Sequence, residues 1–195
     1  MRRVLDAAAS QFIELGFDRT SVESVAQASN VSKMTVYSYF PSKEALFEAC
    51  IGERCNGLFD LFMQAQLDPA HPREALSRVG TLFLELMRHP DVLAMHRMMF
   101  SSALTHPELC AAFYTQGPQP ALQHLANYLL AADQAGALQL APQGAARAAN
   151  QFLAMFLGSE HLASLLGMAL PSPQQDAALV QQNVAMFLRA YRRDV

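Results

Sequence analysis

Hydrophobic positions recur along this chain at the spacing typical of helices. In the first segment a stripe of apolar side chains, spaced three and four residues apart, ends at Gly16. The stripe consists of Leu5, Ala8, Ala9, Phe12 and Leu15. Strict alternation of apolar and polar residues, which would indicate strands, is almost absent. The pattern predicts an all-α protein.

Two short helices joined by a tight turn are predicted next. Thr20 begins a capping box in which its hydroxyl and the Glu23 carboxylate are expected to bind free amides at a helix start. Asn30 indicates a tight turn, because asparagine tolerates left-handed backbone angles. Ser32 is expected to cap a third helix that ends near Phe40.

Longer helices separated by prolines are predicted after Ser42, which is expected to cap a long fourth helix. His89-Pro90, His106-Pro107 and Gly117-Pro118 mark later boundaries. The last two helices are predicted at about residues 144–168 and 173–193. The fold is expected to hold about nine helices, three of them within the first forty residues or so.

Composition adds a surplus of apolar residues. They make up 52% of the chain, and charged residues make up 16%, against a usual share of roughly 25%. This balance excludes a disordered chain and predicts a self-association face or an internal cavity. Three cysteines fit a reducing cytosol, and Glu160 and His161 interrupt the most apolar stretch, so a cytoplasmic protein with no membrane span is expected.

Candidate chemistry gathers in residues 32–43. The two lysines of the chain, Lys33 and Lys43, fall at the starts of the third and fourth predicted helices, where free amides favour phosphate. Hydroxyl and phenol groups lie between them: Ser32, Thr35, Tyr37, Ser38, Tyr39 and Ser42. Helix, turn and short second helix form a helix-turn-helix, whose second helix is sized for the major groove of DNA. The formal net charge of −3 requires this attraction to be local.

A simpler interpretation of the same residues is that the aromatics are core and the lysines are solvated caps. It is preferred for Val36 and Phe40. Tyr37 and Tyr39 cannot both point inward on so short a helix, so at least one phenol is expected at the surface.

An ordered set of motifs runs through residues 2–50. It includes Leu5-Asp6-Ala7-Ala8, Gly16-Phe17, Thr20-Ser21-Val22, Val31-Ser32-Lys33, Thr35-Val36-Tyr37, Tyr39-Phe40 and Ser42-Lys43-Glu44-Ala45-Leu46-Phe47. The set resembles the N-terminal domain of TetR-family transcriptional regulators. The resemblance implies an all-α homodimer with a helix-turn-helix domain at residues 1–47 and a ligand-binding and dimerisation domain at residues 48–195. It also implies a repressor that a small effector releases from its double-stranded DNA operator.

The same resemblance assigns roles to individual residues. Recognition-helix positions are matched by Ser32, Lys33, Thr35 and Tyr37, and phosphate-contacting positions by Thr20, Tyr39 and Lys43. The segment from Met95-His96-Arg97 through Pro107-Glu108-Leu109 to Gly117-Pro118 resembles the AefR-like branch of the family.

The last two predicted helices support a dimer independently of the family resemblance. The helix at about 144–168 is apolar nearly all round and must be buried on more than one side. A four-helix interface between two copies is predicted. A cavity for an apolar or aromatic effector is predicted among methionines and aromatics, although each of these residues also suits an ordinary core. The candidates are Phe62, Phe83, Met87, Met95, His96, Met99, Phe113, Tyr128, Phe152 and Phe156.

An enzyme and a helical adaptor are the two alternatives to DNA binding. An enzyme would need a nucleophile beside a base, a carboxylate pair or a metal cluster, and no such spacing is found in the sequence, so neither a metal nor a cofactor is expected. A helical protein–protein adaptor would explain the apolar surplus. It would not explain why both lysines and several hydroxyls collect around one short helix.

Overall fold

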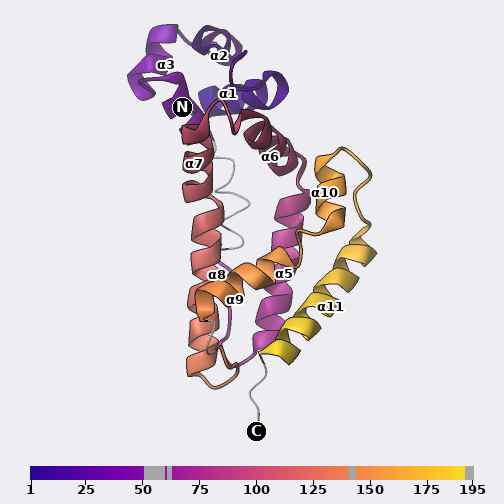
Figure 1. The fold of residues 1–195 in the computed structure, drawn as a ribbon. Coiled ribbons are helices and arrows are strands. Elements are labelled where there is room, and N and C mark those ends of the chain that lie inside the picture. The colour runs from indigo at the N-terminus through magenta and orange to yellow at the C-terminus, as the bar shows by residue number, and fades with distance from the viewer. Residues whose placement is uncertain (51–59, 61–62, 141–143, 192–195) are drawn as a thin grey trace. The chain divides into compact units, whose positions relative to one another are not determined.

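Helices are the only regular elements in the residues that the structure, a computed structural model, describes: 1–50, 60, 63–140 and 144–191 (Figure 1). Ten of them lie wholly within these ranges. The all-α prediction is therefore confirmed. The chain divides into two compact units, one comprising Met1–Leu58 with Pro90–Pro118 and the other Phe59–His89 with Gln119–Val195.

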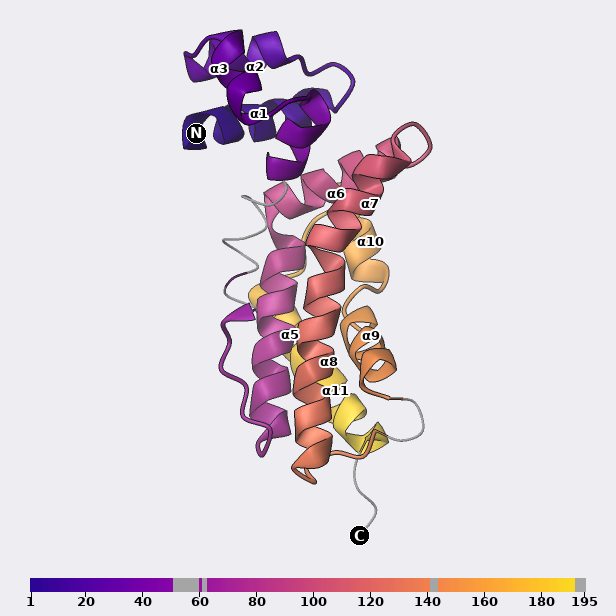
Figure 2. The same cartoon turned by 90° about the vertical axis from the view of Figure 1, so that its left-hand side faces the viewer.

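The first unit contains five of these helices and a helical segment at residues 43–50. The five are α1 (Arg2–Leu15), α2 (Val22–Ser29), α3 (Lys33–Tyr39), α6 (Pro90–Ser102) and α7 (Pro107–Gln116). The second unit contains α5 (Pro72–Arg88), most of α8 (Pro118–Gln134), α9 (Ala145–Ala154), α10 (Ser159–Leu165) and α11 (Pro173–Ala190). Within it α11 packs along α5, as Figures 1 and 2 both show.

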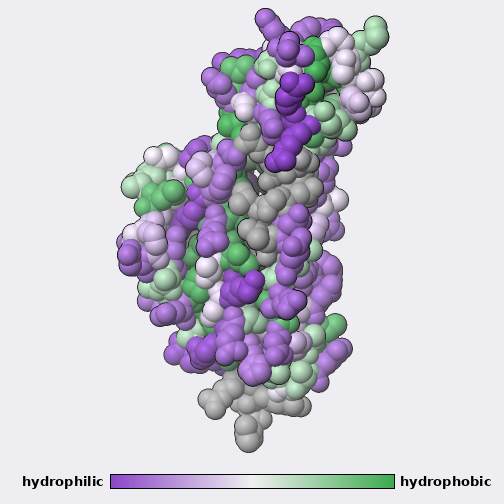
Figure 3. Space-filling model, turned by 180° about the vertical axis from the view of Figure 1, so that it is seen from behind, coloured by the Kyte–Doolittle hydropathy of each residue, from purple (hydrophilic) through white to green (hydrophobic). Residues whose placement is uncertain are grey.

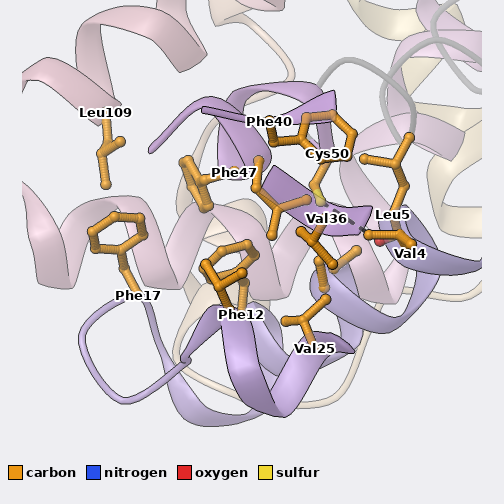
Figure 4. Packing of buried hydrophobic residues seen from close by; sticks show 14 of the residues in the cluster. Val4, Leu5, Phe12, Phe17, Val25, Val36, Phe40, Phe47, Cys50 and Leu109 are labelled. Carbon is orange, nitrogen blue, oxygen red and sulfur yellow. Dashed lines mark hydrogen bonds between the residues drawn. The ribbon is translucent and has the colours of Figure 1, made fainter. Parts of the chain in front are cut away.

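An aromatic cluster forms the centre of the first unit (Figure 4). The Phe12 ring stacks on Phe17 at 5.7 Å between centroids and meets the edge of Phe47 at 5.1 Å. Helices α6 and α7 contribute to the same core through Met95, Met98, Met99 and Leu109. The three N-terminal helices therefore share one hydrophobic core with a segment that follows them by some fifty residues in sequence.

Helix ends in this unit follow local chemistry. Gly16, at φ 82°, ends α1, and Asn30, at φ 56°, adopts the left-handed conformation that its side chain tolerates. Ser32 caps α3, since its hydroxyl accepts from the Thr35 amide at 3.0 Å. Similarly, the Ser42 hydroxyl accepts from the Ala45 amide at 3.1 Å. These four predicted features are confirmed.

The predicted capping box at Thr20 is wrong by one residue. Ser21 is the N-cap of α2, and its hydroxyl accepts from the Ser24 amide at 3.0 Å while Ser24 completes the box. Thr20 is instead buried, and its hydroxyl donates to the Gly16 carbonyl at 2.9 Å. Either hydroxyl suits an N-cap chemically, and burial of the threonine leaves that position to the serine.

The predicted helix at residues 144–168 is interrupted in the structure. Helix α9 ends at Ala154 and α10 begins at Ser159, with Gly158 as its N-cap. Glycine costs more in a helix interior than other residues except proline, and here it stands at the break. The Asn183 amide of α11 donates to the Met155 carbonyl at 2.9 Å, so a partner from another helix satisfies a carbonyl at the end of α9.

The core of the second unit is also aromatic. The Phe152 ring, which is completely buried, meets Phe156 at 5.3 Å and Phe187 at 5.0 Å. Gly80 on α5 allows this packing, because a Cβ atom there would lie 2.9 Å from the Phe156 ring. Phe83 extends the cluster through an edge contact with Phe156 at 6.2 Å.

A charged network in the second unit lies beside this core. The Arg88 guanidinium, at the end of α5, is only 9% exposed and donates to Asp176 at 3.0 Å and Ser164 at 3.2 Å. Glu160 lies 3.5 Å away on α10. The network ties α5 to α10 and α11, and sequence reasoning did not find it.

Candidate nucleic-acid interface

Helix α3 presents nearly all of its side chains to solvent. In this seven-residue helix Val36 alone is buried, and it packs in the core with Val22, Val25 and Ala26 of α2. Tyr37 is 43% exposed and Tyr39 is 56% exposed, so the expectation of at least one exposed phenol is confirmed. Phe40 is buried, as predicted. One buried residue thus anchors the helix and leaves its other side chains at the surface.

Three hydroxyl groups at α3 are already hydrogen-bonded within the helix and its N-cap. The Ser32 and Thr35 hydroxyl oxygens lie 2.8 Å apart, and the Thr35 carbonyl accepts from the Ser38 hydroxyl at 2.7 Å. All three side chains are exposed. Such groups retain lone pairs and rotatable protons with which to bind phosphate or base edges.

Met34 also belongs to this surface, although sequence reasoning missed it. Its side chain is 82% exposed, between Lys33 and Thr35 in the first turn of α3. An exposed apolar side chain on a recognition helix suits contact with a thymine methyl group. Its position within residues 32–39 was the available signal, but an apolar side chain does not stand out among polar candidates.

Lys33 is held by an ion pair that spans the helix-turn-helix. Its ammonium group donates to the Glu23 carboxylate in the first turn of α2. It also lies 5.7 Å from the centre of the Tyr37 ring. The hydrogen bond between Lys33 and Glu23 raises the pKa of Lys33 and lowers the pKa of Glu23. Both groups are therefore charged at neutral pH.

Lys43 fastens the loop between α1 and α2. Its ammonium donates to the Phe17 carbonyl at 3.0 Å and to the Asp18 carbonyl at 3.5 Å, and it lies 4.2 Å from the centre of the Phe17 ring. Because a lysine has three N–H donors, one stays available for an external acceptor beside these carbonyls. Thr20, in the same loop, differs: its buried hydroxyl is already bonded within the protein.

His106, the residue before α7, bonds this loop from the other side. One ring nitrogen lies 2.7 Å from Asp18 and the other 3.3 Å from Glu108, and the ring packs edge-on against Phe17 at 4.8 Å. A neutral imidazole donates through one nitrogen only, so bonds to two carboxylates require the protonated ring. The hydrogen bond to Asp18 raises the pKa of His106 above its usual 6.5.

This geometry makes the stability of the first unit depend on pH. Since the pKa is raised on folding, the contribution of His106 is fully present below about pH 6.5 and is lost as pH rises through the folded-state value. Melting curves of wild type and His106→Gln between pH 5.5 and 8.5 should differ most at the acid end. A difference in melting temperature that stays constant across this range would contradict the assignment.

The predicted effector-pocket residues divide between the two units. Met95, His96, Met99 and Phe113 lie in the first, where the His96 and Phe113 rings meet edge-on at 5.6 Å. The second unit holds Phe83, Met87, Tyr128, Phe152 and Phe156. Phe62 lies outside the described residues. A shared cavity for these side chains stays a prediction.

Tyr128 is the polar member of the second group. Its hydroxyl donates to the Asp68 carbonyl at 3.3 Å, and burial raises its pKa to about 12. It is therefore a neutral hydrogen-bonding group at physiological pH.

Two negative findings concern the described ranges alone. Within them no group of three or more His, Cys, Asp or Glu side chains is arranged to hold a metal ion. Among the helices of those same ranges, none combines the length and the hydropathy that crossing a membrane requires.

A half-buried helix, a tight turn and a short exposed helix that carries hydroxyl donors and a lysine are typical of a helix-turn-helix regulator of transcription. Comparison with known families agrees. Residues 4–50 match the model of bacterial regulatory proteins of the tetR family, and residues 74–193 match the C-terminal domain of AefR-like transcriptional repressors. The chain belongs to the TetR family of transcriptional regulators, and the resemblance noted in the sequence is confirmed.

Relatives support this assignment over the full length. The flavonoid-responsive regulator FrrA is 31% identical, and the match covers 100% of this chain and 97% of FrrA with a TM-score of 0.82. A TetR-family regulator from Mesorhizobium loti MAFF303099 shares the fold at 22% identity, with a TM-score of 0.85 and coverage of 97% and 95%. The HTH-type transcriptional regulator YvkB of Bacillus subtilis (strain 168) is 25% identical over 99% of this chain and 97% of its own length.

Proposed function

We propose that the protein is a homodimeric repressor that binds operator DNA through α3 and leaves it when a small, mostly apolar effector binds. One observation supports the DNA-binding part of the proposal: in α3 only Val36 is buried in the core, and the other side chains are exposed. Lys33, Met34, Thr35 and Tyr37 would meet base edges, and Ser32, Tyr39 and the remaining donor of Lys43 would meet phosphates. Thr20 is left out, since its hydroxyl is buried and already bonded.

The second unit supports the dimer. Large apolar side chains on α10, on the segment after it and on α11 are exposed in the single chain: Leu162, Leu166, Met168, Leu170 and Met186. Figure 3 shows hydrophobic residues among hydrophilic ones at the left edge, where these helices lie. Several large apolar side chains exposed on neighbouring elements are typical of protein–protein interfaces. A two-fold dimer would present two recognition helices to successive turns of the groove, roughly 34–36 Å apart.

Two observations support an apolar or aromatic effector. The candidate pocket residues are methionines and aromatics with Tyr128 and His96 as polar members, a composition typical of small-molecule sites. FrrA, at 31% identity, is described as flavonoid-responsive, and flavonoids are largely aromatic. Repression as the direction of control follows the AefR-like repressor family that the C-terminal segment matches.

The proposal is tested by removing the base-reading side chains. The double variant Lys33→Ala, Tyr37→Ala should lose at least about thirtyfold in affinity for DNA from upstream of its own coding region, since each lost base contact is worth about 1–3 kcal/mol. A gel shift measures this loss, and sedimentation should show that the variant remains a dimer. Undiminished binding would refute the site, and a wild-type protein that shifts no DNA would favour the adaptor.

A further inference from the structure

We propose that Glu23 is a positioning residue that restrains Lys33 and thereby raises the discrimination between operator and other DNA. This inference rests on the proposed DNA-binding function and names a determinant of its specificity. The ion pair links the first turn of α2 to the first residue of α3, ten residues apart in sequence.

The pair lies at the surface that DNA would meet. The Lys33 side chain is 50% exposed and that of Glu23 is 59% exposed. A pair so open to solvent contributes little to folding, because water and salt screen it. The main effect of the ion pair is therefore on which acceptors the Lys33 ammonium can bind. The Tyr37 ring, 5.7 Å away, limits the ammonium further, since its π face also attracts the cation.

The small number of cations in residues 1–50 makes this restraint matter. Residues 1–50 hold five Lys and Arg against six Asp and Glu. Two of these cations are held in place without losing their charge, since Lys43 donates to the Phe17 carbonyl and Arg19 donates to the Leu15 carbonyl at 2.8 Å. Non-specific attraction to DNA depends on the number of phosphates that cations neutralise. Whether Lys33 binds Glu23 or a phosphate therefore has a large effect on the non-specific affinity for DNA.

A restrained lysine distinguishes between two kinds of DNA. On a random duplex, a phosphate must compete with Glu23 for the ammonium, and the carboxylate itself repels that phosphate. In an operator that places a guanine opposite Lys33, that base offers two acceptors, O6 and N7, at a fixed position in the major groove. Those acceptors carry no full charge for the carboxylate to repel. The pair thus weakens contact with random DNA more than contact with the operator.

The test is a double-mutant cycle between Glu23→Gln and Lys33→Gln. Affinity for the operator and for a scrambled duplex of the same composition is measured at several salt concentrations. Glu23→Gln should bind scrambled DNA roughly threefold to tenfold more tightly, with the salt slope steeper by about one, because Lys33 now neutralises a phosphate. The operator affinity should rise less, so the specificity ratio should fall. In the Lys33→Gln background the Glu23→Gln change should leave only the small gain from lost repulsion, equal on the two duplexes and with an unchanged salt slope.

Glu14→Gln supplies the matched control. Glu14 is exposed on α1, so its removal changes the net charge by the same amount. Its effect on the two duplexes should be equal and should persist in the Lys33→Gln background. If Glu23→Gln behaves like Glu14→Gln, the carboxylate acts only as distant repulsion and the inference is overturned. If the wild type binds neither duplex, the proposed function itself fails.

Discussion

Replacing Phe12 by alanine is expected to destabilise the protein by about 3–5 kcal/mol, the range for removing a buried aromatic ring. Phe12 is 1% exposed and contacts both Phe17 and Phe47 at the centre of the first unit. The loss would take a large part of the roughly 5–15 kcal/mol that stabilises an ordinary domain. Because the same core holds Val36 of α3, DNA binding should be lost well below the melting temperature of the wild type.

Guanidinium denaturation followed by helical circular dichroism measures the free energy of unfolding. Glu14→Ala, exposed on the same helix, is the control and should stay within about 0.5 kcal/mol of the wild type. Phe12→Leu should lie between the two, since it leaves a smaller cavity. An alanine variant as stable as Glu14→Ala would show that the ring is not part of a packed core.

The second large effect is expected from Asp176→Asn. Asparagine keeps the shape of the side chain but leaves the buried Arg88 guanidinium without its nearest countercharge, which accepts at 3.0 Å. Breaking a fully buried pair costs roughly 3–5 kcal/mol. Because Asp176 is 22% exposed and Glu160 lies 3.5 Å from Arg88, we expect about 2–3 kcal/mol.

A second variant separates this explanation from general disruption. Adding Arg88→Met removes the buried charge, so the double variant Arg88→Met, Asp176→Asn should recover most of the lost stability. Glu85→Gln, exposed on the same helix α5, should be neutral within about 0.5 kcal/mol. Thermal melting of the four proteins gives the comparison. A double variant that is less stable than Asp176→Asn alone would contradict the role of the charge.

Features set by neighbouring residues could be predicted from the sequence. Gly16, Asn30 and Ser32 each impose a backbone conformation or a capping bond within a few residues, and each has the predicted role. The choice between Thr20 and Ser21 as the cap could not be predicted, because it depends on which side chain the folded loop buries.

The break at Gly158 escaped prediction for a related reason. The apolar pattern continues through it, and the stabilising contact from Asn183 to Met155 comes from a helix much later in the chain. The ion pairs were missed for the same cause: Asp18 and His106 are 88 residues apart, as are Arg88 and Asp176. Such pairs become neighbours only once the helices have packed.

The shared core of α1, α6 and α7 has a consequence for signalling in the proposed repressor. Interiors at crystal-like density transmit displacement rather than absorb it. Leu109 of α7 and Met99 of α6 are buried in one cluster with Phe12, so a push on either helix reaches α1 through side chains already in contact. An effector that displaces residues 90–118 would therefore move α1, α2 and α3 together with α6 and α7 as one rigid body. No hinge between these helices would be required.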